Sequence, residues 1–184
     1  MNRVLVVAAH PDDEVLGCGG TMARMAQDAL LDVLILGHGR EAIDDQNFDR
    51  IGVRALADAI TRRVQSFYPE TVYTHWRGDL NADHRLVFDA TMVACRPQSG
   101  VKNIYAYEVP SSTGLTGEHF QPNDYVEISL AEKAARLCKY KNEMCAFPHP
   151  RSFEGVEILA KLRGMECGCP AAEAFMVVRQ TCRR

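Results

Sequence analysis

The sequence has 184 residues, of which 47% are hydrophobic and 24% are charged, and its formal net charge is −3. This is the composition of a globular chain that is long enough to bury a core without disulfides. It argues against a nucleic-acid binder, which is usually basic, and no apolar run approaches the ~20 residues that a membrane span needs. We therefore expect a cytoplasmic protein whose seven scattered cysteines stay reduced.

Strands and helices alternate along the predicted chain. Residues 3–9 form the first predicted strand, and the continuous apolar run that follows Arg3 is typical of a strand buried on both faces of a parallel sheet. The other predicted strands are residues 31–36, 71–74, 103–108, 125–129 and 173–179, and the predicted helices are residues 14–28, 50–67, 83–95, 129–144 and one that begins after Ser152. This order indicates a single α/β domain over residues 1–184, a Rossmann-like three-layer sandwich with a mostly parallel central sheet.

Reactive side chains follow the first and third predicted strands, where the carboxyl ends of parallel strands bring ligand sites together. His10 and Asp13 flank the turn after the first strand, and His84 lies in the segment after the third. Two imidazoles and a carboxylate suit zinc and leave a position open for water. Asp12 cannot point the same way as Asp13, so it can serve as a general base. Alternatively, both aspartates only complement the dipole of the following helix.

Several stretches of the chain resemble one family. They are 9–14 (AHPDDE), 73–75 (YTH), 78–85 (GDLNADHR), 108–113 (EVPSST), 147–152 (FPHPRS) and 172–175 (AEAF). In this order they are similar to the motifs of PIG-L/LmbE-like N-acetylglucosaminyl deacetylases, including the bacterial members. The resemblance implies one Zn²⁺ on His10, Asp13 and His84, or another divalent transition metal, with Asp12 as general base.

One departure from the family pattern concerns proton transfer. Asn81 stands where the second motif often has histidine, and an amide can donate a hydrogen bond but cannot transfer a proton at neutral pH. The acid that protonates the leaving amine must then come from elsewhere. We predict that His149, between Pro148 and Pro150, lies over the site and fills this role. A surface histidine in a proline turn is the alternative.

The segment after the second strand is shorter than in the family. Arg40 and Asp45 lie in this segment, and the resemblance suggests them for sugar binding. The other histidines, His38, His75 and His119, are expected in loops or behind the metal ligands. The number of subunits stays open, with a homo-oligomer as one alternative.

The sequence thus leads to two hypotheses about function. In the first, the protein is a hydrolase that removes the acetyl group from a small N-acetylated amino sugar or its glycoconjugate, by attack of zinc-bound water. In the second, it is a catalytically degenerate, Rossmann-like sugar-binding protein. The complete set of metal ligands favours the enzyme, because a binding protein has no need of Asp12.

Overall fold

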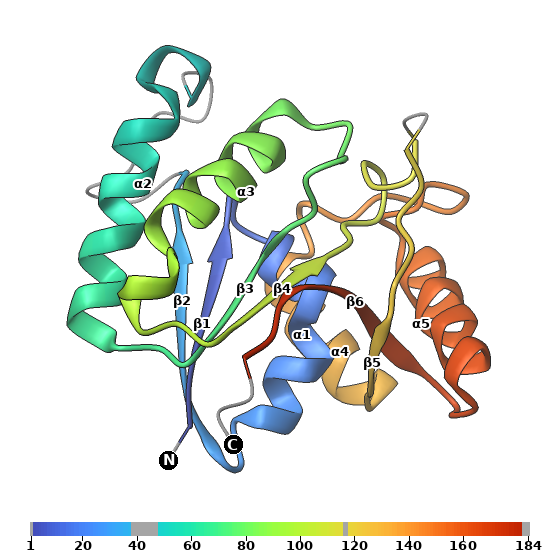
Figure 1. The fold of residues 1–184 in the computed structure, drawn as a ribbon. Coiled ribbons are helices and arrows are strands. Elements are labelled where there is room, and N and C mark those ends of the chain that lie inside the picture. The colour runs from blue at the N-terminus through green and yellow to red at the C-terminus, as the bar shows by residue number, and fades with distance from the viewer. Residues whose placement is uncertain (1, 38–47, 116–117, 182–184) are drawn as a thin grey trace.

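A six-stranded sheet forms the middle layer of the protein, and helices cover both of its faces (Figure 1). The computed structural model describes residues 2–37, 48–115 and 118–181. The strand order is β2-β1-β3-β4-β6-β5; β1 to β4 run parallel, and β6 pairs antiparallel with both β4 and β5. The strands are β1 (Asn2–Ala8), β2 (Ala29–Ile35), β3 (Thr71–His75), β4 (Asn103–Tyr107), β5 (Asp124–Glu127) and β6 (Ala172–Arg179). The helices are α1 (Asp13–Met25), α2 (Phe48–Phe67), α3 (Ala82–Ala94), α4 (Leu130–Leu137) and α5 (Phe153–Cys167), with short 3₁₀ turns at η1 (Pro97–Ser99) and η2 (Cys138–Tyr140). The expected three-layer α/β fold with a mostly parallel sheet is confirmed.

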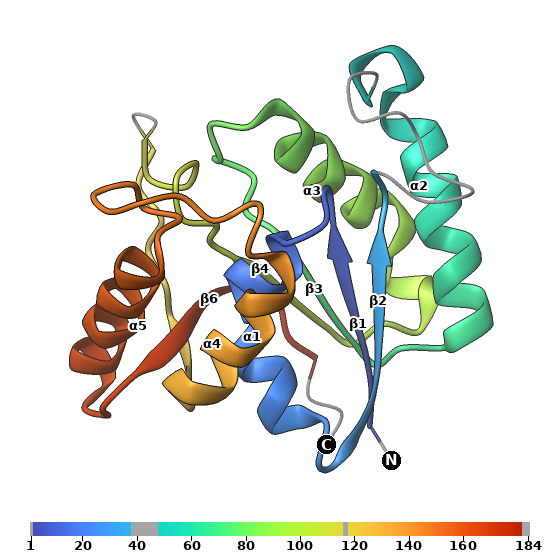
Figure 2. The same ribbon diagram turned by 180° about the vertical axis from the view of Figure 1, so that it is seen from behind.

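The central strand β1 divides the core into two parts. Leu5 and Val7 point to one face, where they pack with residues of α2 and α3 such as Ile60 and Val87. Residues 4 and 6 point to the other face, where α1, α4 and α5 lie (Figure 2). Both faces are therefore covered by helices, as the unbroken apolar run of this strand predicted.

Two predicted elements differ from the structure. The apolar strand predicted at residues 31–36 corresponds to β2, which is only half-buried, and Leu30 and Val33 are exposed because β2 lies at the edge of the sheet. The helix predicted to reach Met144 ends at Leu137 and continues as the 3₁₀ turn η2. Asn81, Ser129 and Ser152 cap their helices, because each accepts a backbone N–H in the first turn.

A close approach to the sheet breaks α1 in the middle. Cys18 has φ −143°, outside the helical range, so the helix bends there. A Cβ at Gly17 would lie 2.2 Å from the ring of Tyr107, and one at Gly20 would lie 2.7 Å from Ile128. The absence of a side chain at these two positions is what lets α1 lie against Tyr107 of β4 and against Ile128, which follows β5.

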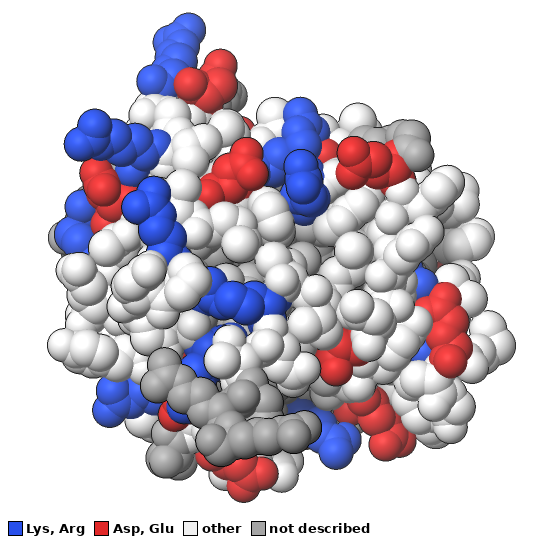
Figure 3. Space-filling model, viewed as in Figure 1, with Lys and Arg blue, Asp and Glu red and all other residues white. Residues whose placement is uncertain are grey.

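Charges of both signs are interspersed on the face shown in Figure 3. Within the described residues, the helices lack the combination of length and apolar character that crossing a bilayer requires.

Candidate active site

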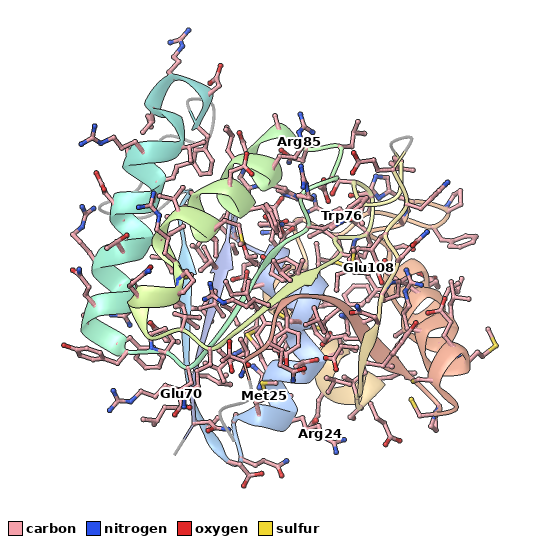
Figure 4. The ribbon with its side chains drawn as sticks, in the orientation of Figure 1. Arg24, Met25, Glu70, Trp76, Arg85 and Glu108 are labelled. Atoms are coloured by element: carbon pink, nitrogen blue, oxygen red, sulfur yellow. The ribbon has the colours of Figure 1, made fainter. Side chains whose placement is uncertain are left out.

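The loops that follow β1, β3 and β4 meet at the edge of the sheet formed by the carboxyl ends of these strands (Figure 1). Figure 4 labels Trp76, Arg85 and Glu108 toward this edge, and Glu70 and Arg24 toward the opposite one. Ligand sites of open parallel sheets lie at the carboxyl edge. The sequence placed its candidate residues at this same edge.

The side chains of the three predicted metal ligands lie together, with both histidines next to one carboxylate oxygen of Asp13. Oδ2 of Asp13 lies 3.3 Å from Nδ1 of His10 and 3.3 Å from Nε2 of His84. One donor atom from each residue lies within 4.8 Å of the other two. Because two imidazoles and one carboxylate are a usual donor set for zinc and related divalent ions, this cluster fits such a metal.

Each histidine of the cluster has a second carboxylate on its other ring nitrogen. Nε2 of His10 lies 3.1 Å from Oδ2 of Asp83, and Nδ1 of His84 lies 3.2 Å from Oδ1 of Asp79. Carboxylates in this position fix the ring and the tautomer of a metal-binding histidine. The donors that face Asp13 are therefore held in place by the surrounding protein.

Asp79 is itself fixed by the loop that follows β4. It is 1% exposed, and it accepts hydrogen bonds from the hydroxyls of Ser112 and Thr113 and from the backbone N–H of Asn81. The loops after β3 and β4 are thereby joined behind His84.

The charges of the cluster shift the pKa values of its members. Burial alone would disfavour the ionised form of Asp13, but the neighbouring His10 and His84 outweigh it and hold the pKa of this carboxyl well below its usual range. Burial also opposes the charge on His84, yet Asp13 and Asp79 raise its pKa to about 9. Asp13 is therefore anionic at neutral pH, which suits a metal ligand.

His75, expected in a loop or behind the ligands, is the last residue of β3 and is fully buried. Its Nε2 accepts the backbone N–H of Ala9 and lies 3.2 Å from the hydroxyl of Tyr107, and its ring stacks on His84 at 3.9 Å. Burial and the charge of His84 hold the pKa of His75 well below its usual range. His75 is thus a neutral, buried ring that packs against His84 and helps to hold this ligand in place.

Asp12 stands at the N-cap of α1 but does not cap the helix. Its side chain makes no capping hydrogen bond, and its φ of 98° lies in a region that residues other than glycine rarely adopt. The carboxylate instead forms an ion pair with Arg151. Burial and the charge of Asp13 raise the pKa of Asp12 to about 7, although Arg151 opposes the shift. The alternative of a simple helix-dipole residue does not account for this arrangement.

Sequence reasoning missed Arg151. It chose His149 from the same loop because histidine titrates near neutral pH. The structure leaves His149 exposed, with its Nδ1 accepting the backbone N–H of Arg151. The sequence did offer an indication of Arg151, because in the motif 147–152 a permanently charged arginine follows the two prolines. A catalytic role of His149 stays a prediction.

A cavity of about 390 Å³ opens over the cluster. Its lining consists mostly of polar residues: His10, Pro11, Asp12, Asp13, Asn81, His84, Val109, Ser111, Ser112, Glu143 and Arg151. Asn81 lines the cavity while its Oδ1 accepts the N–H of Asp83. Arg40 and Asp45, the predicted sugar-binding residues, and His38 lie outside the described residues, and His119 is exposed.

A further contact braces the first turn of α1. Glu14 accepts the backbone N–H of Asp12 and the hydroxyl of Tyr140, which η2 supplies. The early end of α4 therefore has a role, because the turn that replaces its last residues brings Tyr140 to the loop that carries Asp12.

Comparisons with known proteins agree with this geometry. A family model described as PIG-L, GlcNAc-PI de-N-acetylase, matches residues 5–45. The chain is 28% identical over 174 residues to the uncharacterized deacetylase YaiS of Escherichia coli (strain K12), covering 76% of this chain and 90% of that protein. Its fold is similar to that of the conserved protein TT1542 from Thermus thermophilus, with a TM-score of 0.76, 20% identity and coverage of 100% and 98% of the two chains. It is also similar to the zinc-inhibited form of teicoplanin deacetylase Orf2, with a TM-score of 0.72, 17% identity and coverage of 99% and 100%. The first part of the chain thus matches the PIG-L family model, and the chain as a whole is similar to a deacetylase of this type.

Proposed function

We propose that this protein is a metal-dependent hydrolase that removes the acetyl group from an N-acetylated amino sugar or its conjugate. His10, Asp13 and His84 hold the metal, with zinc as the first candidate. Asp12 is the general base, and Asn81 is a hydrogen-bond donor at the edge of the cavity.

The observation that carries this proposal is the position of Asp12. Its carboxylate lines the same cavity as the three metal donors, and its pKa is raised by burial and by Asp13 to about 7. This carboxyl group can therefore accept a proton from water and later donate one to an amine.

A metal in this cluster supplies a Lewis acid that polarises the acetamide carbonyl and lowers the pKa of water. The protein's own residues carry out the proton transfers. Asp12 takes the proton of the attacking water and returns it to the nitrogen as the carbon–nitrogen bond breaks, which leaves acetate and a free amine. Arg151 orients the Asp12 carboxylate through their ion pair. His149 is the second candidate for the acid, although its imidazole is exposed.

The lining of the cavity supports a substrate that carries hydroxyl groups. Ser111, Ser112, Asn81 and Glu143 offer hydrogen-bonding groups around the cluster, with few apolar neighbours. The matching family model is described for a GlcNAc conjugate, and the similar structure of Orf2 is that of a teicoplanin deacetylase. Both descriptions agree with an acetamide on a larger molecule.

Acetate release tests the proposal. The protein is stripped with a chelator, reloaded separately with zinc, cobalt or manganese, and assayed with a panel of N-acetyl amino sugars and glycosides. Several metals are needed because the similar Orf2 structure is a zinc-inhibited form. We expect activity that the chelator removes and one of the metals restores.

The matched variants are Asp12→Asn and Asp58→Asn, the second an exposed carboxylate on α2. Asp12→Asn should retain the metal and lose about 10²–10⁴-fold in kcat, the usual contribution of a general base. Asp58→Asn should match the wild type. Binding of these sugars without acetate release under any metal would favour the degenerate sugar-binding protein instead.

A further inference from the structure

A pair of cysteines lies where α5 ends and the chain turns into β6. The Sγ atoms of Cys167 and Cys169 are 3.3 Å apart. Cys167 is exposed and Cys169 is partly exposed, so both sulfurs are within reach of a small molecule. This turn lies at the edge of the sheet opposite the carboxyl ends of β1 and β3 (Figure 1).

The backbone of the turn holds the two thiols together. Gly168 adopts φ 80°, the left-handed conformation that ends many helices and that glycine adopts without strain. The N–H of Cys169 then donates to the carbonyl of Gly164, which fixes the turn against the last turn of α5. The residue between the cysteines is thus the one that allows their side chains to meet.

The pair does not have the composition of a structural metal site. A structural zinc ion needs about four ligands. Among the described residues, the group of three or more metal-binding side chains is His10, Asp13 and His84, which excludes this turn. Two thiols without further ligands are instead suited to bond to each other.

We propose that Cys167 and Cys169 form a redox-active dithiol, which low-molecular-weight disulfides convert to an internal disulfide. One cysteine, as thiolate, attacks the small disulfide and releases one small thiol. The second cysteine, 3.3 Å away, then displaces the other small thiol and closes the Cys167–Cys169 bond. The two cysteine sulfurs lose two protons and two electrons, and the small disulfide becomes two thiols. Closure brings the sulfurs to the ~2.05 Å of a disulfide.

Oxidised glutathione distinguishes this pair from isolated cysteines in the same chain. The native protein is incubated with oxidised glutathione, blocked with an alkylating agent and digested with trypsin. Cleavage at Arg163 and Arg179 releases residues 164–179 with both cysteines and no others, and cleavage at Lys141 and Arg151 releases residues 142–151 with the exposed Cys145 alone. We expect peptide 164–179 to lose two hydrogens and carry no adduct, whereas peptide 142–151 gains one glutathione.

Single variants isolate the second step. Cys167→Ser and Cys169→Ser should each stop at a glutathione adduct on the remaining cysteine, because the neighbouring sulfur of the pair is then gone. The control Cys145→Ser should leave the internal disulfide unchanged. Peptide 164–179 of the wild type carrying glutathione adducts, or remaining fully reduced while peptide 142–151 reacts, would overturn the proposal. The readout involves no catalysis, so it is independent of the deacetylase proposal.

Discussion

Glu173 stabilises the break in α1, and removal of its side chain should markedly lower the free energy of unfolding. The side chain is 4% exposed and accepts hydrogen bonds from the backbone N–H groups of Gly20 and Thr21, which begin the second half of the helix. It also pairs with the buried Lys133, whose ammonium donates to the carbonyl of Leu16 on the other side of the break. Glu173→Ala removes two charge-assisted hydrogen bonds and leaves a buried ammonium without its counter-charge. Breaking a buried ion pair in this way costs about 3–5 kcal/mol.

Urea unfolding measures this loss directly. Domains of this kind have about 5–15 kcal/mol of stability in total, so the variant should fold but unfold at a much lower urea concentration. At about 2–4 °C per kcal/mol for a chain of this size, the melting temperature should fall by roughly 6–20 °C.

Two controls make the reasoning refutable. Adding Lys133→Met to Glu173→Ala removes the unpaired charge, so the double variant should lose less stability than the sum of the single variants. Glu157→Ala breaks a pair of the same chemistry with Lys161 on the surface, which should cost ~0.3–0.5 kcal/mol. A loss below about 1 kcal/mol for Glu173→Ala, or strict additivity with Lys133→Met, would show that the network does not stabilise the break.

Four further predictions concern the candidate active site. Arg151→Ala should lower kcat by about 10–100-fold with normal metal content, because a hydrogen bond to a charged group contributes about 1.5–3 kcal/mol; an unchanged rate would show that Asp12 needs no partner. His149→Ala should keep the wild-type rate if Asp12 is the acid, and a fall of about 10²-fold would assign the proton to His149. Asp79→Asn should weaken metal binding by about 10–100-fold in a chelator competition assay. Burial opposes the charge on His84, but the neighbouring carboxylates raise its pKa to about 9. The metal must displace that proton, so metal affinity should rise with pH up to this value and level off above it; an affinity independent of pH would contradict the shift.

Local sequence patterns predicted the core of the fold but not its edges. The run at β1 specified a strand buried on both faces, and the helix starts predicted at residue 83, at Ser129 and after Ser152 lie within one residue of those in the structure. Nothing in the apolar residues of β2 indicated that this strand lies at the edge, because strand order is decided by pairing with distant segments. The early end of α4 escaped prediction for a similar reason, since it depends on Tyr140 reaching Glu14.

Residue types and their spacing predicted that His10, Asp13 and His84 lie at one edge of the sheet, and the structure places them together. The choice between His149 and Arg151 could not be made in this way. Both lie in one short loop, and which of them faces Asp12 depends on backbone hydrogen bonds within that loop. The ability of an imidazole to transfer a proton near neutral pH favoured His149, whereas in the folded loop Arg151 is the residue that contacts Asp12.

The cavity is built from segments that lie far apart in the chain, at residues 10–13, 81–84, 109–112 and 143–151. These side chains meet only when the whole sheet has formed, so whatever binds there binds the folded chain and not the unfolded one. A ligand at a hundred times its Kd then adds about 2.7 kcal/mol to the free energy of unfolding. Proteases attack the unfolded population, and this gain in stability lowers that population by about a hundredfold. A metal bound at His10, Asp13 and His84, as proposed above, would therefore slow proteolysis of the chain in addition to its role in catalysis.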